Sequence, residues 1–88
     1  MKIESDPIKA VSNLKKHGVS FEEAETALYD KAALVQEDVD SVGENRWVLV
    51  GLSNKVRLLT IVYTLRNNEI IRLISARKAT KKEAEYYA

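Results

Sequence analysis

NLKKHGVSFEEA, residues 13–24, is the stretch in which one helix is predicted to end and a second to begin. Gly18 is typical of a helix C-terminus because glycine readily adopts the left-handed conformation found there. Ser20, followed three residues later by Glu23, is the capping-box pattern that starts a helix. The stretch therefore predicts a helix, a tight turn and another helix.

The first of these helices is predicted to begin at Asp6 and Pro7, which suit its N-cap and its first position. Ile8, Val11 and Leu14 then recur at three-residue spacing, so they should share one face of this helix. Capping and periodicity together predict a helix that ends at the glycine of the tight turn.

The pattern changes to strands after the second helix, which is expected to end near residues 29–30. Strands are predicted at residues 33–36, 46–52, 57–64 and 69–76, with a polar loop at 37–45 and a compact turn at Asn67-Asn68. Because the connections are short, these strands should form an antiparallel meander. The segment 58–62 is apolar on both faces, so it is expected at the centre of the sheet.

A further capping box, Thr80 with Glu83, predicts a short C-terminal helix through residues 86–87. The predicted fold is α+β, with two N-terminal helices, a small antiparallel sheet of three to four strands and a short C-terminal helix. A single domain is expected over residues 1–88. A chain of this length buries only about 60 to 65 per cent of the surface that it exposes when unfolded, so it gains stability from a partner.

The composition excludes several classes of protein. The chain has no cysteine, so neither a disulfide framework nor a thiolate zinc site is expected. Its single histidine, His17, has no carboxylate at metal-ligand spacing, and no metal or other cofactor is predicted. No apolar run approaches about 18 residues, and the N-terminus lacks the apolar core of a signal peptide. The expected location is therefore the cytoplasm, without a membrane partner.

Charge is distributed unevenly along the chain, although the formal net charge is only +1. Residues 21–45 hold eight acidic residues and one basic residue, whereas residues 46–88 hold nine basic and three acidic residues. The second half is therefore the expected phosphate-facing half. The alternative is that these charges only keep an exposed surface solvated.

The chain resembles the BrnT family of bacterial type II toxins. The resemblance is carried by the stretch 13–24, by Ile74-Ser75-Ala76-Arg77, and by Asp6, Pro7, Lys9, Glu44, Arg46, residues 62–64, Arg72, Ala79 and Glu83. The chain departs from the family at Ser5, where the family usually has tryptophan. Loss of that aromatic ring could remove a base-stacking platform or only a packing contact.

The resemblance implies a RelE-like fold and an endoribonuclease toxin that cuts RNA to stop growth. It also implies a partner, a BrnA-type antitoxin of ribbon-helix-helix fold, which blocks the toxin and represses their shared operon. Operator DNA would be contacted only through the antitoxin, and a toxin dimer within a hetero-oligomer is an open alternative. We expect the antitoxin to bind across the basic corner where the last strand meets the last helix, near Arg77 and Lys81.

RNA cleavage without a metal requires a base for the 2′-hydroxyl, cations for the charge that builds on the phosphorane, and an acid for the departing 5′-oxygen. Arg77 and Arg46 are predicted to stabilise that charge. His17 is one candidate for proton transfer because histidine exchanges protons near neutral pH. Tyr63 is the other, because it alternates with Arg57 on a strand face that would bind RNA if it were open.

Phosphate binding is predicted for five further basic residues: Lys16, Arg57, Arg72, Lys78 and Lys81. Arg72 and Arg77 are an odd number of residues apart on one strand, so they should point to opposite faces unless a β-bulge intervenes. Structural alternatives remain for two of these residues. His17 would be stabilised at a helix C-terminus without any function, and Tyr63 would pack in the core with its polar tip at the surface.

Two other functions are compatible with the sequence. One is a non-catalytic interaction module that keeps the fold and the antitoxin contact, for which Ser5 is the supporting feature. The other is a small DNA-binding protein, which the weak net charge disfavours.

Overall fold

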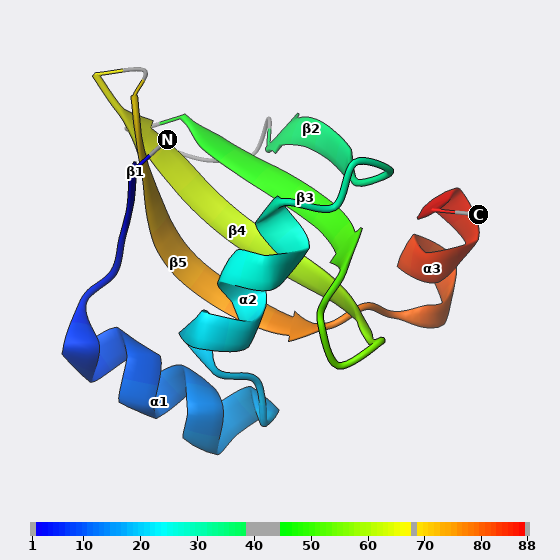
Figure 1. Cartoon of the computed structure of the whole chain (residues 1–88), viewed down its shortest axis with the longest axis horizontal. Helices are drawn as coiled ribbons and strands as arrows, with labels where there is room; N and C mark the ends of the chain where they lie inside the picture. The colour runs from blue at the N-terminus through cyan, green and yellow to red at the C-terminus, as the bar shows by residue number, and fades with distance from the viewer. Residues whose placement is uncertain (1, 39–44, 68, 88) are drawn as a thin grey trace.

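The computed structural model describes residues 2–38, 45–67 and 69–87 (Figure 1). Its elements in chain order are β1 (Lys2–Glu4), α1 (Pro7–His17), α2 (Phe21–Leu28), β2 (Leu34–Asp38), β3 (Arg46–Leu52), β4 (Leu58–Arg66), β5 (Ile70–Lys78) and α3 (Lys81–Tyr87). The predicted loop at 37–45 is wrong at its start, because residues 37 and 38 continue β2. The rest of that loop up to residue 44, the match at Glu44 and the second residue of the turn at Asn67-Asn68 lie outside the described residues.

The strands form one mixed sheet in the order β1-β5-β4-β3-β2. The antiparallel meander from β2 to β5 is confirmed, and β4 lies at the centre as predicted. β1 was not predicted, so the expected count of three to four strands is wrong for the described part of the chain. β1 is only three residues long, and it pairs in parallel with residues 70–72 of β5, which are distant from it in the sequence.

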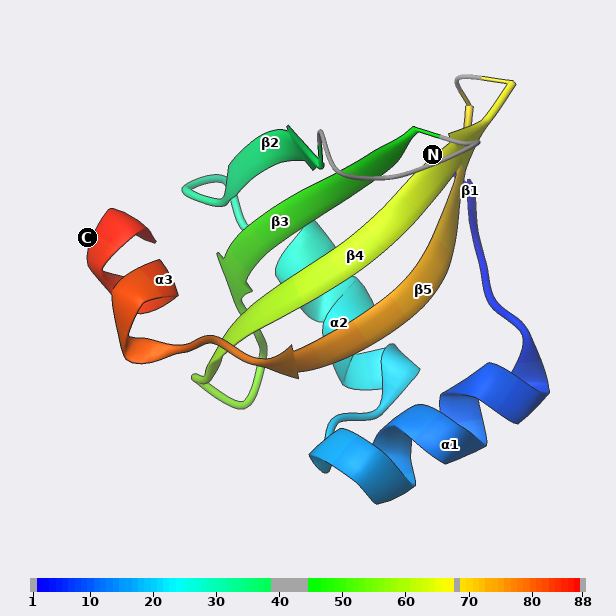
Figure 2. The same cartoon turned by 180° about the vertical axis from the view of Figure 1, so that it is seen from behind.

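Helix α2 covers one face of the sheet, and the core lies between them (Figure 1). The core cluster consists of Val19, Phe21, Ala24, Ala27, Leu49, Leu59, Ile61, Tyr63, Ile71, Leu73 and Ala76. Figure 2 shows the face that α2 leaves uncovered, with α1 beside β5 and α3 at the opposite side of the molecule. We call this second face the open face.

The predicted helix ends are confirmed by their hydrogen bonds. The Asp6 carboxylate accepts from the backbone N–H of Ile8 at 2.9 Å. Gly18 has φ 68° and its N–H donates to the Leu14 carbonyl at 2.9 Å. Ser20 Oγ accepts from the backbone N–H of Glu23 at 3.0 Å. The first two helices therefore begin and end where local capping chemistry places them.

The Thr80 and Glu83 pair completes both halves of its capping box, with hydrogen bonds of 2.8 and 3.2 Å. The Ser20 and Glu23 pair completes only one half. The Glu23 carboxylate instead accepts from Ser53 Oγ at 2.7 Å and from Arg57 Nε at 2.9 Å. The Glu23 carboxylate therefore forms a long-range ion pair with Arg57 in place of the local hydrogen bond to the Ser20 backbone N–H.

The apolar face of α1 is turned toward solvent. Ile8, Val11 and Leu14 are 79%, 57% and 51% exposed, respectively. The residue that α1 buries is the polar Asn13, which is 6% exposed. Amphipathic spacing alone would favour the reverse arrangement, so the contact between α1 and the sheet rests on a polar side chain.

Candidate active site

An irregularity in β5 decides which side chains share the open face. Val62 of β4 lies opposite Ser75, but the next residue, Tyr63, lies opposite Leu73, so β5 contains one extra residue, Ile74. A bulge of this kind shifts the alternation of the side chains that follow it. The condition under which Arg72 and Arg77 share a face is therefore met.

The cross-strand pairs show the result of this bulge. Arg72 lies opposite Thr64 and Arg77 lies opposite Thr60, and these two threonines are an even number of residues apart on β4. Arg46 of β3 is the other neighbour of Thr64. Arg46, Arg72 and Arg77 thus belong to one face of the sheet, the face shown in Figure 2.

Arg46 and Arg72 flank Thr64 from the two adjacent strands. Since neighbouring strands lie about 4.8 Å apart, their Cα atoms are separated by about 10 Å. Two arginine side chains can reach toward a common ligand over that distance, and the planar guanidinium suits phosphate. The two arginines therefore form a candidate phosphate clamp.

Glu4 of β1 neighbours this clamp. Its carboxylate accepts from Arg66 Nη1 at 2.8 Å and from Arg72 Nη1 at 3.1 Å. The hydrogen bonds from Arg66 and then Arg72 lower the pKa of Glu4. Arg66 is not among the predicted site residues. Its partner Glu4 is 62 residues away in the sequence, so no local pattern indicates the contact.

Arg77 is held by α3. Its Nη1 and Nη2 atoms donate to the two carboxylate oxygens of Glu83 at 2.7 and 2.9 Å. Glu83 also accepts from Thr60 Oγ1 at 2.9 Å. These partners, chiefly Arg77, lower the pKa of Glu83 from 4.5 to about 2. The charge of Arg77 is therefore balanced in this structure, although its side chain remains 39% exposed.

His17 and Lys16 lie at the end of α1 and are both exposed. They line a cavity of about 170 Å³ together with Lys9, Ser12, Asn13, Ile74 and Ser75. Ser75 belongs to β5 between the two arginines of that strand. The Lys16-His17 motif and the Ile74-Ser75 motif are thus brought together at the β5 edge of the open face.

Tyr63 and Arg57 lie on the opposite, covered face, so the condition for a base-stacking Tyr63 is not met. Tyr63 is 7% exposed within the core, and burial raises the pKa of its hydroxyl. Arg57 pairs with the buried Glu23 and donates to the Gly18 carbonyl at 3.3 Å. The hydrogen bonds from Arg57 and Ser53 lower the pKa of Glu23. Arg57 therefore fastens the turn between the first two helices.

The two remaining predicted lysines lie at the margin. Lys78 is the last residue of β5 and lies opposite Leu59, whose side chain belongs to the core. Lys81 is the exposed first residue of α3. Neither position converges on the arginine clamp.

Ser5 borders a hollow of about 400 Å³ between β1, α1 and α2. Its apolar lining includes Ile3, Val11, Leu14 and Phe21. A tryptophan at this position would meet these side chains. The departure from the family at Ser5 therefore lies beside a hollow between β1, α1 and α2.

Within the described ranges, no group of three His, Asp or Glu side chains is placed to hold a metal ion. No helix in the same ranges is long and apolar enough to cross a membrane.

Comparison with known proteins identifies the family. The family described as the ribonuclease toxin BrnT of a type II toxin-antitoxin system matches residues 6–83. The crystal structure of the Brucella abortus ribonuclease toxin BrnT is similar, with a TM-score of 0.71 and 26% sequence identity over 92% of this chain and 99% of that one. No curated protein matches. The chain belongs to the BrnT family of ribonuclease toxins of type II toxin-antitoxin systems.

Proposed function

We propose that this chain is a metal-independent endoribonuclease toxin with a RelE-like fold and that the open face of its sheet binds RNA. The observation that supports this most strongly is the bulge at Ile74, which places Arg72 and Arg77 on the same face as Arg46. Three guanidinium groups on the sheet face that α2 leaves uncovered, with α3 covering only the Thr60 end of that face, suit a polyanion.

Arg46 and Arg72 hold the reacting phosphate from two sides in this mechanism. They stabilise the negative charge that builds on the phosphorane as the 2′-oxygen attacks, which is the largest single contribution in reactions of this type. Arg77 is separated from Arg72 by about 15 Å along β5, so it contacts a different phosphate of the same strand.

His17 transfers the protons. As a base it removes the proton from the 2′-hydroxyl, whose oxygen then bonds to phosphorus while the bond from phosphorus to the 5′-oxygen breaks. The protonated His17 then gives its proton to the departing 5′-oxygen, so the products are a 2′,3′-cyclic phosphate and a free 5′-hydroxyl. Lys16 binds a flanking phosphate beside His17, and Lys78 and Lys81 attract RNA over longer distances. Tyr63 and Arg57 have no role in this mechanism. Tyr63 is packed in the core and Arg57 is paired with Glu23, both on the face that α2 covers.

Three carboxylates that lie near arginines are already committed to ion pairs, which favours a mechanism without a metal at these positions. Glu4, Glu23 and Glu83 each accept hydrogen bonds from an arginine, so their charges are already balanced. A hard divalent cation needs several carboxylate or carbonyl oxygens that are not committed in this way.

Family membership implies a protein antitoxin as partner. We infer a BrnA-type ribbon-helix-helix antitoxin, a cytoplasmic location, and contact with operator DNA only through that antitoxin. The basic corner formed by Arg77, Lys78, Lys81 and Lys82 supports one contact with it, because acidic protein segments and RNA both complement this charge.

Expression of the chain alone tests the function. Growth should stop, and the purified chain should cut RNA in excess EDTA. The double variant Arg46→Ala/Arg72→Ala should be folded but inactive, whereas Lys31→Ala, an exposed change in the acidic half, should remain active. Loss of cleavage in EDTA with recovery on adding magnesium would contradict the metal-independent mechanism. Antitoxin binding without any RNA cleavage would favour a non-catalytic module.

A further inference from the structure

The most unusual surface of the molecule is the uncovered apolar face of α1. Ile8, Val11 and Leu14, which we call the α1 stripe, are 79%, 57% and 51% exposed. The helix contacts the rest of the fold through Ala10 and Asn13 on another face. A contiguous apolar surface on a small protein commonly marks an interaction site.

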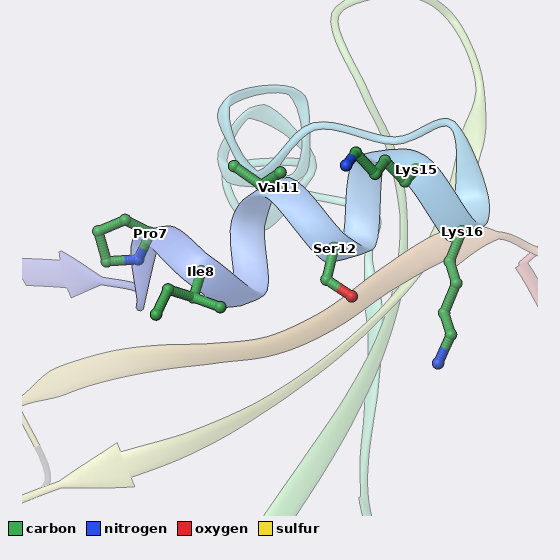
Figure 3. Close-up of a pocket in the computed structure, with 6 residues that line it drawn as sticks. All are labelled: Pro7, Ile8, Val11, Ser12, Lys15 and Lys16. Atoms are coloured by element: carbon green, nitrogen blue, oxygen red, sulfur yellow. The ribbon is translucent and has the colours of Figure 1, made fainter.

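Two hollows border the α1 stripe. One, of about 660 Å³, is lined by Pro7, Ile8, Val11, Ser12, Lys15 and Lys16 (Figure 3). The other, of about 400 Å³, lies between Val11, Leu14 and the side chains of Ile3 and Phe21. Val11 borders both hollows, so a segment laid along α1 could place apolar side chains on either side of it.

The two hollows beside the α1 stripe differ in charge: Lys15 and Lys16 line the larger one with no acidic residue, whereas Glu22 and Glu25 line the smaller one. Helix α1 contains no acidic residue, and Lys15, Lys16 and His17 occupy its last turn. Figure 3 shows Pro7 and Ile8 near the start of the helix and the two lysines near its end. A partner segment that occupies the larger hollow is therefore complementary if its apolar residues are flanked by Asp or Glu on the side that faces Lys15 and Lys16, which is the pattern by which an amphipathic helix recognises a groove.

A second copy of the chain fits this surface poorly. Three aliphatic side chains are smaller than the aromatic ones that bury about 150–250 Å² each, so they expose well under the roughly 800 Å² per partner of a stable interface. A short segment of another protein needs less area, because it can be tethered by contacts elsewhere.

We propose that the α1 stripe binds an acidic amphipathic helical segment of the protein antitoxin, in addition to any contact at the basic corner. This inference rests on the proposed function, because that function supplies the antitoxin. It assigns the recognition to Ile8, Val11 and Leu14 as apolar contacts and to Lys15 and Lys16 as charged flanks. RNA binding on the open face does not use these three apolar residues.

The test measures the dissociation constant between the purified chain and the product of the adjacent ribbon-helix-helix reading frame. Val11→Asp should weaken binding at least 100-fold, and Lys15→Glu should weaken it about 10-fold with less dependence on salt. Val56→Asp is the control, because Val56 is an exposed valine outside α1, with 79% exposure against 57% for Val11. It should bind normally, and all variants should stay folded and keep the toxicity of the unaltered chain.

Several results would overturn this assignment. They are unaltered binding by folded Val11→Asp, no binding by the unaltered chain, and loss of toxicity in Val11→Asp with binding retained. Sedimentation that shows a dimer of the chain alone, abolished by Val11→Asp, would assign the stripe to a second copy instead. A chain that is not toxic but loses binding on Val11→Asp would refute the proposed function and leave the docking surface standing.

Discussion

The side-chain amide of Asn13 forms hydrogen bonds with both the backbone carbonyl and the backbone N–H of Ala76. Its Nδ2 donates to the Ala76 carbonyl at 2.7 Å, and its Oδ1 accepts from the Ala76 N–H at 3.1 Å. The same Nδ2 donates to the Val19 carbonyl at 2.9 Å. β1 pairs with β5 only at residues 70–72, so Asn13 takes the place of a neighbouring strand at Ala76. One side chain therefore fixes α1 against the strand that carries the bulge.

Asn13→Ala should destabilise the protein by about 3 kcal/mol, because it leaves buried backbone groups without partners. Chemical denaturation measures this loss directly. Asn54→Ala is the control, since the Asn54 side chain accepts only one long, exposed hydrogen bond of 3.4 Å, and its effect should stay within about 0.5 kcal/mol. Equal effects of the two substitutions would show that Asn13 does not fasten α1.

Local chemistry explains which parts of the fold were predictable. The ends of α1 and the start of α3 depend on caps within four residues of each other, so Gly18 and the Thr80 and Glu83 pair could be read directly from the sequence. The central position of β4 followed from its apolar faces. Each of these features needs no knowledge of distant contacts.

Long-range contacts explain what was not predictable. The bulge that aligns Arg72 with Arg77 appears only when β4 is paired with β5. The hydrogen bond between Arg72 and Glu4 joins residues 68 positions apart. Tyr63 has the alternation of a surface strand residue, and only the position of α2 decides that its face is buried. The sequence therefore predicts which kinds of residue form the candidate site, but not which of these residues lie together on one face.

Tyr63→Phe and His17→Ala should affect the reaction differently. Tyr63 is packed in the core, so removal of its hydroxyl should leave toxicity and RNA cleavage unchanged. His17→Ala removes the proposed proton-transfer group and should lower turnover at least 100-fold. The single-turnover rate of RNA cleavage, measured for both variants and for the unaltered chain, tests this difference. Loss of turnover in folded Tyr63→Phe with full activity in His17→Ala would exchange their assignments.

Acid should weaken the attachment of α3. The folded pKa of Glu83 is lowered from 4.5 to about 2. Its ionised form therefore contributes stability that is present above pH 4.5 and is lost as the pH falls toward 2. Unfolding measured from pH 6 to pH 2 should show a smaller loss for Glu83→Gln than for the unaltered chain. Glu85→Gln, two residues further along α3, should keep the original pH dependence. Identical curves for all three proteins would refute this role.

Ser5→Trp should stabilise the protein by about 0.5–2 kcal/mol, because the aromatic ring would fill the hollow lined by Ile3, Val11 and Phe21. The melting temperature reports the gain, and Ser5→Ala serves as the control for loss of the hydroxyl. RNA cleavage should not change. Faster cleavage without any rise in melting temperature would indicate that an aromatic ring at this position stacks on a base.

Arg77 has two separable roles, since its guanidinium pairs with Glu83 and also lies on the open face. If Arg77 binds a phosphate, Arg77→Ala should lower cleavage about 10- to 100-fold, the loss expected for a charged hydrogen bond of about 1.5–3 kcal/mol. Glu83→Ala should then retain cleavage, because it loosens α3 but leaves Arg77 available to RNA. Lys81→Ala should also remain toxic and only reduce the salt dependence of binding.

The opposite pattern would assign Arg77 to the structure alone. In that case Arg77→Ala and Glu83→Ala would lower activity and melting temperature together, because both remove the ion pair that holds α3 against Thr60. Circular dichroism must accompany the kinetics, so that loss of fold is not mistaken for loss of a contact. Folded and fully active Arg77→Ala would leave Arg46 and Arg72 as the only arginines of the proposed reaction, since these two alone flank Thr64.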